Sequence, residues 1–177
     1  METTRPFAAS VMKVAANETI RMIDMQAHRV RSTLPEDDHA FFGEAEFRRD
    51  ADYVLFAFAL WRLREIAAAV QQHLAAVAPD SDATQALGKA HTDFRSELPE
   101  LNQLRHLTTH VGDYAAGLGR DRTVHPGELY VGEYINGVRP VARAAVDVDI
   151  AVAASESLYL ATIEALSATT PDSGPKQ

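Results

Sequence analysis

The sequence predicts an all-α protein, a bundle of four to five helices with an inserted β-hairpin near residues 128–146. Three observations lead to this fold class. Long segments carry apolar residues at helical spacing, prolines and glycines separate those segments, and only one short stretch alternates with a period of two. A length of 177 residues fits one domain. We expect a single helical domain over residues 1–168 and a disordered tail over 169–177.

The first two predicted helices span residues 10–33 and 44–77. The first ends before Pro35 and the second before Pro79, because proline cannot continue a helix. A wide apolar stripe marks the second helix and should face the core. Its members are Phe47, Ala51, Val54, Leu55, Phe58, Trp61, Leu63, Ile66, Val70 and Leu74. We therefore expect Trp61 to be a core residue.

Two further helices follow in the middle of the chain. Ser81 or Asp82 can cap a helix that runs through Leu98. Pro99 fits the first turn of the next helix, where a missing amide donor costs nothing. That helix should run to about Ala116 and end at the glycines of residues 117 and 119.

The spacing of apolar residues changes after residue 128. The stretch "ELYVGEYINGVRPVARAAV" has a period near two on both sides of Asn136-Gly137, a dipeptide typical of hairpin turns. Pro140 marks one arm of the hairpin as an edge strand. Asp147 or Asp149 can then cap a last helix that continues to about Leu166.

Composition excludes several kinds of site. The chain has no cysteine, so disulfides and thiolate metal sites are excluded, which fits a reducing cytosol. No segment resembles a signal peptide, and no apolar run approaches the ~20 residues of a membrane span. We expect a cytoplasmic protein with no membrane partner. Lys+Arg 17 against Asp+Glu 25 gives a net charge of −8, so a broad basic surface for nucleic acid is not expected.

The stretch "LRHLTTHVGDY", residues 104–114, concentrates polar residues of chemical interest. At about 100° per residue, the leucines at 98, 101, 104, 107 and 118 and the valine at 111 form one apolar stripe. The opposite arc should face water or a second copy of the chain. It contains Asn102, Arg105, His106, Thr109, His110 and Asp113.

Three interpretations of this arc remain open. It can be a solvated face in which His110 or His106 pairs with Asp113. It can be a metal site, because His106 and His110 stand at i and i+4, although no pattern selects a third ligand. It can also catalyse acid–base chemistry on a phosphodiester, in which histidine moves a proton and arginine holds the phosphate. Arg105 and His110 lie about 140° apart on one helix, so two facing copies would combine them more easily.

The segment "RHLTTH", Arg105 to His110, resembles the R-x4-H signature of HEPN domains, in which a polar residue usually follows the arginine. His106 stands at that polar position. Tyr114 is similar to a tyrosine that some members keep, but it stands two positions further on. The resemblance implies a helical bundle and a homodimer with a composite cleft. Active members are metal-independent endoribonucleases, often toxins or antiviral effectors, and others serve in binding or scaffolding.

The resemblance also implies roles for individual residues. Arg105 would bind and polarise the phosphate, His110 would transfer the proton, and His106 would orient one of them or contact the RNA. Asn102, Asp113 and Tyr114 would support the site. The expected reaction is attack of an RNA 2′-hydroxyl on the neighbouring phosphate, without a metal or other cofactor, and a neutralising protein is an expected partner of a toxin.

The segment "GLGRDR", residues 117–122, follows the motif helix directly. We interpret it first as a helix end and a solvated loop, and second as a source of phosphate contacts from Arg120 or Arg122. Two alternatives to the ribonuclease remain. One is a non-catalytic interaction module whose polar arc and hairpin bind a protein, and the weaker one is a metal-dependent helical-bundle enzyme that uses His106 and His110.

Overall fold

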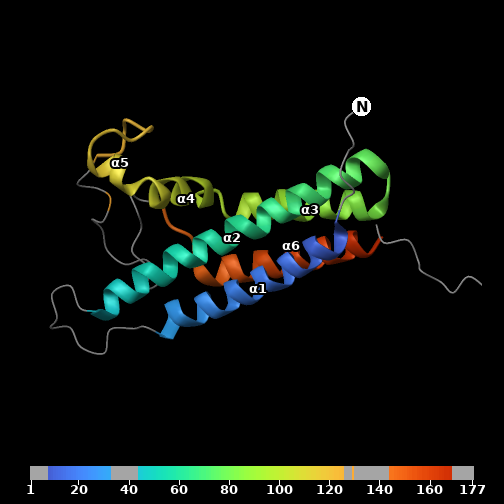
Figure 1. The fold of residues 1–177 in the computed structure, drawn as a ribbon, viewed down its shortest axis with the longest axis horizontal. Helices are drawn as coiled ribbons and strands as arrows, with labels where there is room; N and C mark the ends of the chain where they lie inside the picture. The colour runs from blue at the N-terminus through green and yellow to red at the C-terminus, as the bar shows by residue number, and fades with distance from the viewer. Residues whose placement is uncertain (1–7, 33–43, 126–128, 130–143, 169–177) are drawn as a thin grey trace, which may run out of the picture.

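The all-α prediction is confirmed by a computed structural model, which describes residues 8–32, 44–125, 129 and 144–168 (Figure 1). The helices are α1 (Ala9–Ser32), α2 (Glu44–Val77), α3 (Asp82–Glu97), α4 (Leu101–Thr109), α5 (Val111–Ala115) and α6 (Val148–Ala168). The bounds of the first two helices differ from the predicted ones by at most one residue. Their apolar spacing and the prolines beyond them are sufficient local signals.

The long helix α2 is the centre of the bundle. It packs against α1, α3, α4 and α6, and α6 also packs against α1 and α3. Figure 1 shows α1, α2, α3 and α6 running alternately in opposite directions, while α4 continues from α3 back along α2. The largest fully buried side chains are Tyr114, Phe56, Phe94, Ile23, Leu60, Leu63, Leu87, Leu101, Leu104, Leu107, Leu158 and Leu166.

The predicted stripe of α2 is only partly correct. Leu63, Val70 and Leu74 are buried as expected, but Leu55 is 47% exposed, and Phe56 and Leu60 face the core in addition. The reason is that α2 has neighbours on several sides. A helix covered on more than one face buries a wider and shifted arc than a single amphipathic stripe indicates.

Two capping predictions are confirmed by hydrogen bonds. The Ser81 hydroxyl accepts a bond of 3.2 Å from the backbone N–H of Thr84 and is the N-cap of α3. At α6, an Asp147 carboxylate oxygen accepts bonds from the backbone N–H groups of Asp149 (2.9 Å) and Ile150 (3.1 Å). Of the two aspartates considered for α6, Asp147 is therefore the cap.

The single helix predicted from Pro99 to Ala116 is wrong in two respects. It begins at Leu101, and it is interrupted at His110, whose φ of −114° and ψ of 28° depart from helical values. Before the break, the hydroxyls of Thr108 and Thr109 donate to the backbone carbonyl of Arg105, at 3.0 and 2.7 Å. Such bonds compete with the backbone ladder and bend helices. The two short helices α4 and α5 therefore replace one long helix.

The predicted β-hairpin is not supported. No β-strand occurs within the described ranges, and most of residues 128–146, including Asn136-Gly137 and Pro140, lies outside them. The predicted tail, 169–177, also lies outside the described residues. A period of two shows only that a segment can pair, whereas a strand needs a partner edge.

The C-terminal helix α6 meets a criterion that we expected no segment to meet. By length and composition it is apolar enough to cross a membrane. A core helix of a soluble protein meets the same criterion, and α6 packs against α1, α2 and α3. The apolar character of α6 is accounted for in part by those contacts, since Leu158 and Leu166 belong to the shared core.

Tyr53 on α2 ties the start of α6 to the bundle. Its buried hydroxyl donates to the carbonyl of Val146 (3.2 Å) and accepts from the N–H of the same residue (2.6 Å). Next to it, a Glu100 carboxylate oxygen accepts a bond of 2.8 Å from the N–H of Ala145. Burial, and then the carboxylates of Glu100 and Asp147, raise the pKa of Tyr53 to about 12.

Tyr53→Phe is expected to lower the free energy of unfolding by about 1–3 kcal/mol at neutral pH, because it leaves the buried polar groups of Val146 unpaired. Tyr53→Phe should also change how the free energy of unfolding depends on pH above 10. The pKa of Tyr53 is higher in the folded state than its ordinary value of 10.0, so its contribution is complete below pH 10 and is lost as the pH rises to 12. That loss amounts to about 2–3 kcal/mol in the wild type.

Urea unfolding at several pH values measures both effects. Tyr159→Phe is the matched control, because its hydroxyl donates to the Asn17 side chain at 2.7 Å in a partly buried position. The wild type and Tyr159→Phe should share the steep fall in stability between pH 10 and 12, and Tyr53→Phe should show a shallower one. Equal slopes for all three proteins would contradict the role assigned to Tyr53.

Candidate functional site

Helix α4 buries its leucines in the core, while two polar residues of its other face, Asn102 and Arg105, also contact α2. Leu101, Leu104 and Leu107 are buried, as the predicted stripe requires. Leu118, placed on the same stripe, is 69% exposed because the chain has left the helix before that residue. The predicted polar arc therefore exists, and its residues are held by the contacts of α4 with α2.

Arg105 lies against Trp61 of α2. The guanidinium carbon stands 4.5 Å from the ring centroid, a cation–π contact. The Nε atom of Arg105 is buried without a hydrogen-bond partner. Trp61 was expected in the core, but it is only half-buried and supports Arg105. Within the described ranges, the terminal nitrogens of this guanidinium make no hydrogen bond, so they can donate to a ligand.

His106 is half-buried, which differs from the expectation that the arc faces water. Its ring lies edge-on to the Tyr114 ring, with centroids 5.8 Å apart, and 4.8 Å from the His110 ring at a tilt of 50°. The Nε2 atom of His106 is buried without a hydrogen-bond partner. Part of this burial comes from the buried Tyr114 of α5, whose ring lies beside that of His106.

Of the two local pairs that the sequence suggested for Asp113, the one with His110 is formed. The imidazole Nδ1 lies 3.2 Å from a carboxylate oxygen of Asp113, and both side chains are exposed. A carboxylate at Nδ1 fixes the orientation of the ring and favours the tautomer in which Nδ1 carries the proton. In that tautomer Nε2 points away with a free lone pair. His110 thus has the arrangement of a positioned general base.

The loop after α5 closes around the buried Tyr114 ring. The Tyr114 hydroxyl accepts a bond of 3.2 Å from the N–H of Asp121. A Cβ at Gly119 would stand 2.2 Å from the Tyr114 ring, so only glycine fits there. Gly117, with φ 72°, ends the helix in the left-handed conformation, and the prediction of a helix end at this residue is confirmed.

A cavity of about 370 Å³ lies beside this loop, lined by His106, Tyr114, Arg120 and Asp121. The hydroxyl and N–H of Thr123 lower the pKa of Asp121, with a smaller contribution from the charge of His106. Of the two arginines considered as phosphate contacts, Arg120 lines the cavity. Arg122 instead donates to the carbonyl of Gly117 at 3.0 Å, in the role of a loop residue.

The structure brings together some predicted site residues and separates others. His106, His110, Asp113 and Tyr114 form one connected group. In the part of the chain that the structure describes, no hydrogen bond or ring contact joins Arg105 to that group's His110. Asn102 lies at the other end of α4, where its side-chain oxygen accepts a hydrogen bond from Arg64.

Sequence reasoning missed three partners of these residues, namely Trp61, Arg64 and Asp121. Trp61 and Arg64 lie on α2, about 40 residues before their partners, and no local pattern links such positions. Asp121 was available in the motif "GLGRDR", but its approach to His106 depends on how the loop folds back over Tyr114.

Metal binding finds limited support in this geometry. The rings of His106 and His110 are close, but His110 is already paired with Asp113. Among the described residues, no group of three or more histidine, aspartate or glutamate side chains is arranged to hold a metal ion. A zinc site in a protein normally has three or four protein ligands.

The α4–α5 segment therefore combines a carboxylate-paired imidazole, a second imidazole with an unpartnered buried nitrogen, and a guanidinium in cation–π contact with Trp61. These are groups suited to proton transfer and to phosphate binding. No protein-family model, curated protein or solved structure matches this chain. What the protein does is consequently inferred from the geometry of these side chains.

Proposed function

We propose that this chain is a HEPN-like cytoplasmic homodimer that cleaves RNA without a metal ion, at a site composed of residues from two copies. Arg105 binds the phosphate and His110 transfers the proton. The observation that carries the proposal is the pairing of the exposed His110 side chain, through Nδ1, with Asp113 at 3.2 Å, which orients the ring and leaves Nε2 to act as a base.

The contact of Arg105 with Trp61 is compatible with phosphate binding. A guanidinium that lies flat on an aromatic ring keeps its N–H donors pointing outward in its own plane. Trp61 thus limits the motion of the side chain while the terminal nitrogens stay free for phosphate oxygens. Ordering Arg105 before substrate binds lowers the entropy cost of fixing the phosphate.

The chemical step follows from these positions. His110 Nε2 removes the proton of a 2′-hydroxyl, whose oxygen attacks the adjacent phosphorus. The bond from phosphorus to the 5′-oxygen breaks, and that oxygen takes a proton from water, while His110 returns the proton it removed to the solvent. The products are a 2′,3′-cyclic phosphate and a free 5′-hydroxyl. Arg105 stabilises the charge that develops on the phosphate oxygens.

A composite site accounts for the separation of Arg105 and His110 within one chain. Two copies that face each other through α4 and α5 would place Arg105 of one against His110 of the other. The net charge of −8 also favours a local site, because a chain this acidic does not attract RNA over a broad basic surface. Arg120, which lines the neighbouring cavity, can hold an adjacent phosphate.

Incubating the purified protein with single-stranded RNA in the presence of EDTA tests the proposal. We expect fragments that end in 2′,3′-cyclic phosphates, identified by mass spectrometry. Intact RNA under these conditions, or cleavage only after Mg²⁺ is added, would remove the metal-independent mechanism.

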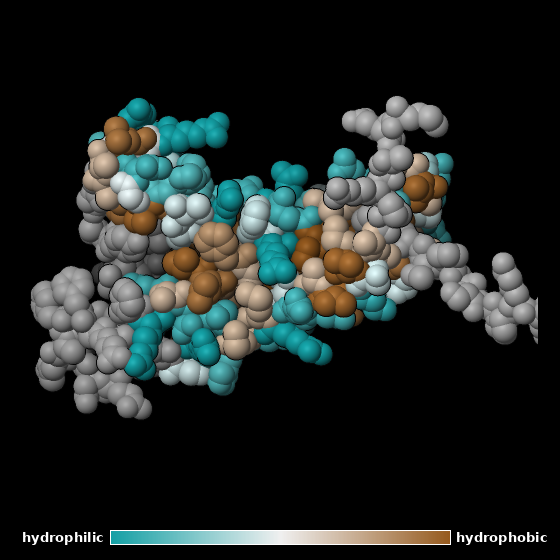
Figure 2. All heavy atoms as spheres, viewed as in Figure 1, coloured by the Kyte–Doolittle hydropathy of each residue, from teal (hydrophilic) through white to brown (hydrophobic). Residues whose placement is uncertain are grey.

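A second function is favoured by a different observation. Arg105 and His106 are half-buried and contact Trp61 and Tyr114, so the arc also has a structural role. Leu118, which follows the arc in the sequence, is exposed. Figure 2 shows hydrophobic residues scattered among hydrophilic ones on the face in view. This alternative is a non-catalytic module that binds a protein, including a neutralising partner. It predicts intact RNA and the loss of a partner when the arc is mutated.

A further inference from the structure

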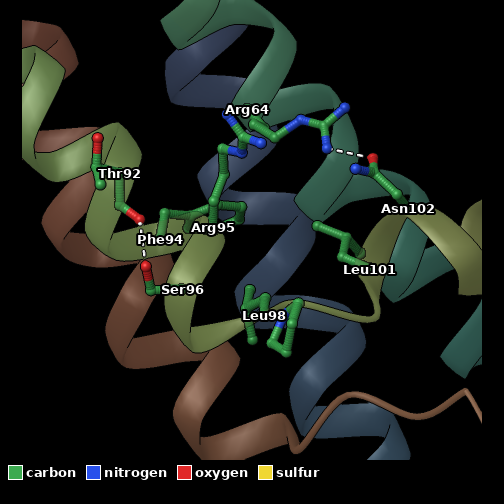
Figure 3. Close-up of a pocket in the computed structure, with 9 residues that line it drawn as sticks. Arg64, Thr92, Phe94, Arg95, Ser96, Leu98, Leu101 and Asn102 are labelled. Atoms are coloured by element: carbon green, nitrogen blue, oxygen red, sulfur yellow. Dashed lines mark hydrogen bonds between the residues drawn. The ribbon is translucent and has the colours of Figure 1, made fainter.

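A second and larger cavity lies at the junction of α3 and α4, on the side that faces α2. Its volume is about 490 Å³. Figure 3 shows two arginines at this cavity: Arg64 extends from α2 to Asn102, and Arg95 extends from α3 toward α2. The other lining residues are Thr92, Phe94, Ser96, Leu98, Pro99 and Leu101. The cavity is separate from the group around His110.

The two guanidinium groups are held differently. The Arg64 side chain is only 15% exposed and donates to the side-chain oxygen of Asn102 and, at 2.8 Å, to a carboxylate oxygen of Glu65. Arg95 has no hydrogen bond or ion pair in the described part of the chain. One arginine is therefore fixed in the wall of the cavity, and the other is a cation without a counter-charge.

His91 lies one helical turn before Arg95, and the charges near the cavity affect its pKa. Burial lowers its pKa, and the positive charges of Arg64 and Arg95 lower it further, against a smaller opposite effect of Glu65. The same two arginines thus act on a third group. Two arginines therefore meet at this cavity although the whole chain is acidic.

Among the side chains that line this cavity, hydrogen-bond donors outnumber acceptors. A guanidinium has five N–H donors, and Arg64 uses two of its donor atoms in the bonds above. Because the Asn102 oxygen accepts from Arg64, its amide group has donors to offer. The hydroxyls of Thr92 and Ser96 donate to backbone carbonyls of α3, at 2.9 and 3.0 Å. These two hydroxyls can therefore only accept a hydrogen bond from a ligand. These side chains favour a ligand that is rich in acceptors and negatively charged.

We propose that this cavity is a binding site for a phosphate group, either free or as a small phosphate monoester, held between Arg64 and Arg95 with Asn102. A phosphate dianion has enough oxygens to accept hydrogen bonds from both planar guanidiniums, whereas a carboxylate ligand has a single edge with two oxygens. The volume exceeds that of the bare anion and leaves room for an organic part against Leu98 and Pro99. The proposal does not depend on the proposed ribonuclease activity.

Titration calorimetry of the full chain with inorganic phosphate, AMP and adenosine tests this site. The main variant is Arg95→Gln, whose exposed side chain has no partner to lose, so folding should be unaffected. Arg62→Gln is the matched control, since Arg62 is an exposed arginine on α2 outside the cavity. We expect Arg95→Gln to weaken phosphate and AMP binding about tenfold or more, and Arg62→Gln to leave both unchanged.

The comparison of ligands separates the two sources of phosphate. Equal affinities for phosphate and AMP assign the site to the free anion, and tighter AMP binding assigns it to a monoester. Either result supports the proposal. Adenosine binding as tightly as AMP would overturn it, as would phosphate and AMP both failing to bind at millimolar concentration, or equal weakening in Arg62→Gln and Arg95→Gln.

The proton resonances of His91 provide a second readout that does not depend on affinity. A bound dianion would offset the charges of Arg64 and Arg95, so the pKa of His91 should rise when phosphate is added to the wild type. Burial and then the charges of these two arginines and Glu65 set this pKa, and the Gln71 amide oxygen lies 3.0 Å from His91 Nδ1. A titration of His91 that phosphate does not move would contradict occupancy of the cavity.

Discussion

Replacing His110 by alanine is expected to lower the rate of RNA cleavage by about 10²- to 10⁴-fold, the usual contribution of a positioned acid or base. His110 is exposed and stands at the break between α4 and α5, so the fold should tolerate the change. The measurement is the cleavage rate of a labelled single-stranded RNA in EDTA. Asp113→Asn should give a smaller loss, because it removes the partner that orients the imidazole but keeps the base.

Control variants distinguish the loss of a catalytic group from the loss of folded protein. His28→Ala removes an exposed histidine from α1, far along the chain from the arc, and should cleave at the wild-type rate. Arg105→Lys keeps the charge but loses the planar fork, so its activity should fall while its thermal stability changes little. Wild-type cleavage by a folded His110→Ala protein would refute the assignment of the base.

Mixing two inactive variants tests whether the site is shared between copies. In a symmetric dimer of Arg105→Ala with His110→Ala, one of the two sites has both wild-type residues and the other has neither. After subunit exchange, activity should return to roughly a quarter of the wild-type value, because half of the dimers are mixed. A mixture that stays inactive although subunits exchange would place both residues in the site of one chain.

Tyr114→Ala is expected to lower the free energy of unfolding by about 3–5 kcal/mol, the usual cost of deleting a buried aromatic ring. The ring is 1% exposed, contacts His106, and supports the loop through Gly119. Its loss should also free the loop that carries Arg120 and Asp121. Chemical denaturation measures the stability, and proteolysis within residues 117–123 measures the release of the loop.

Tyr114→Phe is the matched control for this change. It keeps the ring and removes only the acceptor for the N–H of Asp121, an exposed residue, so the cost should be about 1 kcal/mol or less. The loop should stay resistant to the protease in this variant. Similar losses of stability for alanine and phenylalanine would show that the hydroxyl, and not the packed ring, holds the loop.

The sequence alone determined the helices and most of their ends. The spacing of apolar residues fixed α1 and α2 almost to the residue, and Ser81, Asp147 and Gly117 marked boundaries that hydrogen bonds or dihedral angles confirm. These signals are local, because a helix and its caps depend on residues within one or two turns. The polar arc around His110, including its pair with Asp113, is local in the same sense.

Tertiary structure alone decided the partners of the site residues. The contact of Arg105 with Trp61, the bond of Arg64 to Asn102 and the approach of Arg95 to α2 join helices that are distant in sequence. The interruption at His110 likewise places Tyr114 beside His106 and creates the cavity next to Arg120. Such pairings depend on how whole helices pack, and helix periodicity specifies only which face is buried. Burial of a polar side chain, and the ligand it can hold, follows from that packing.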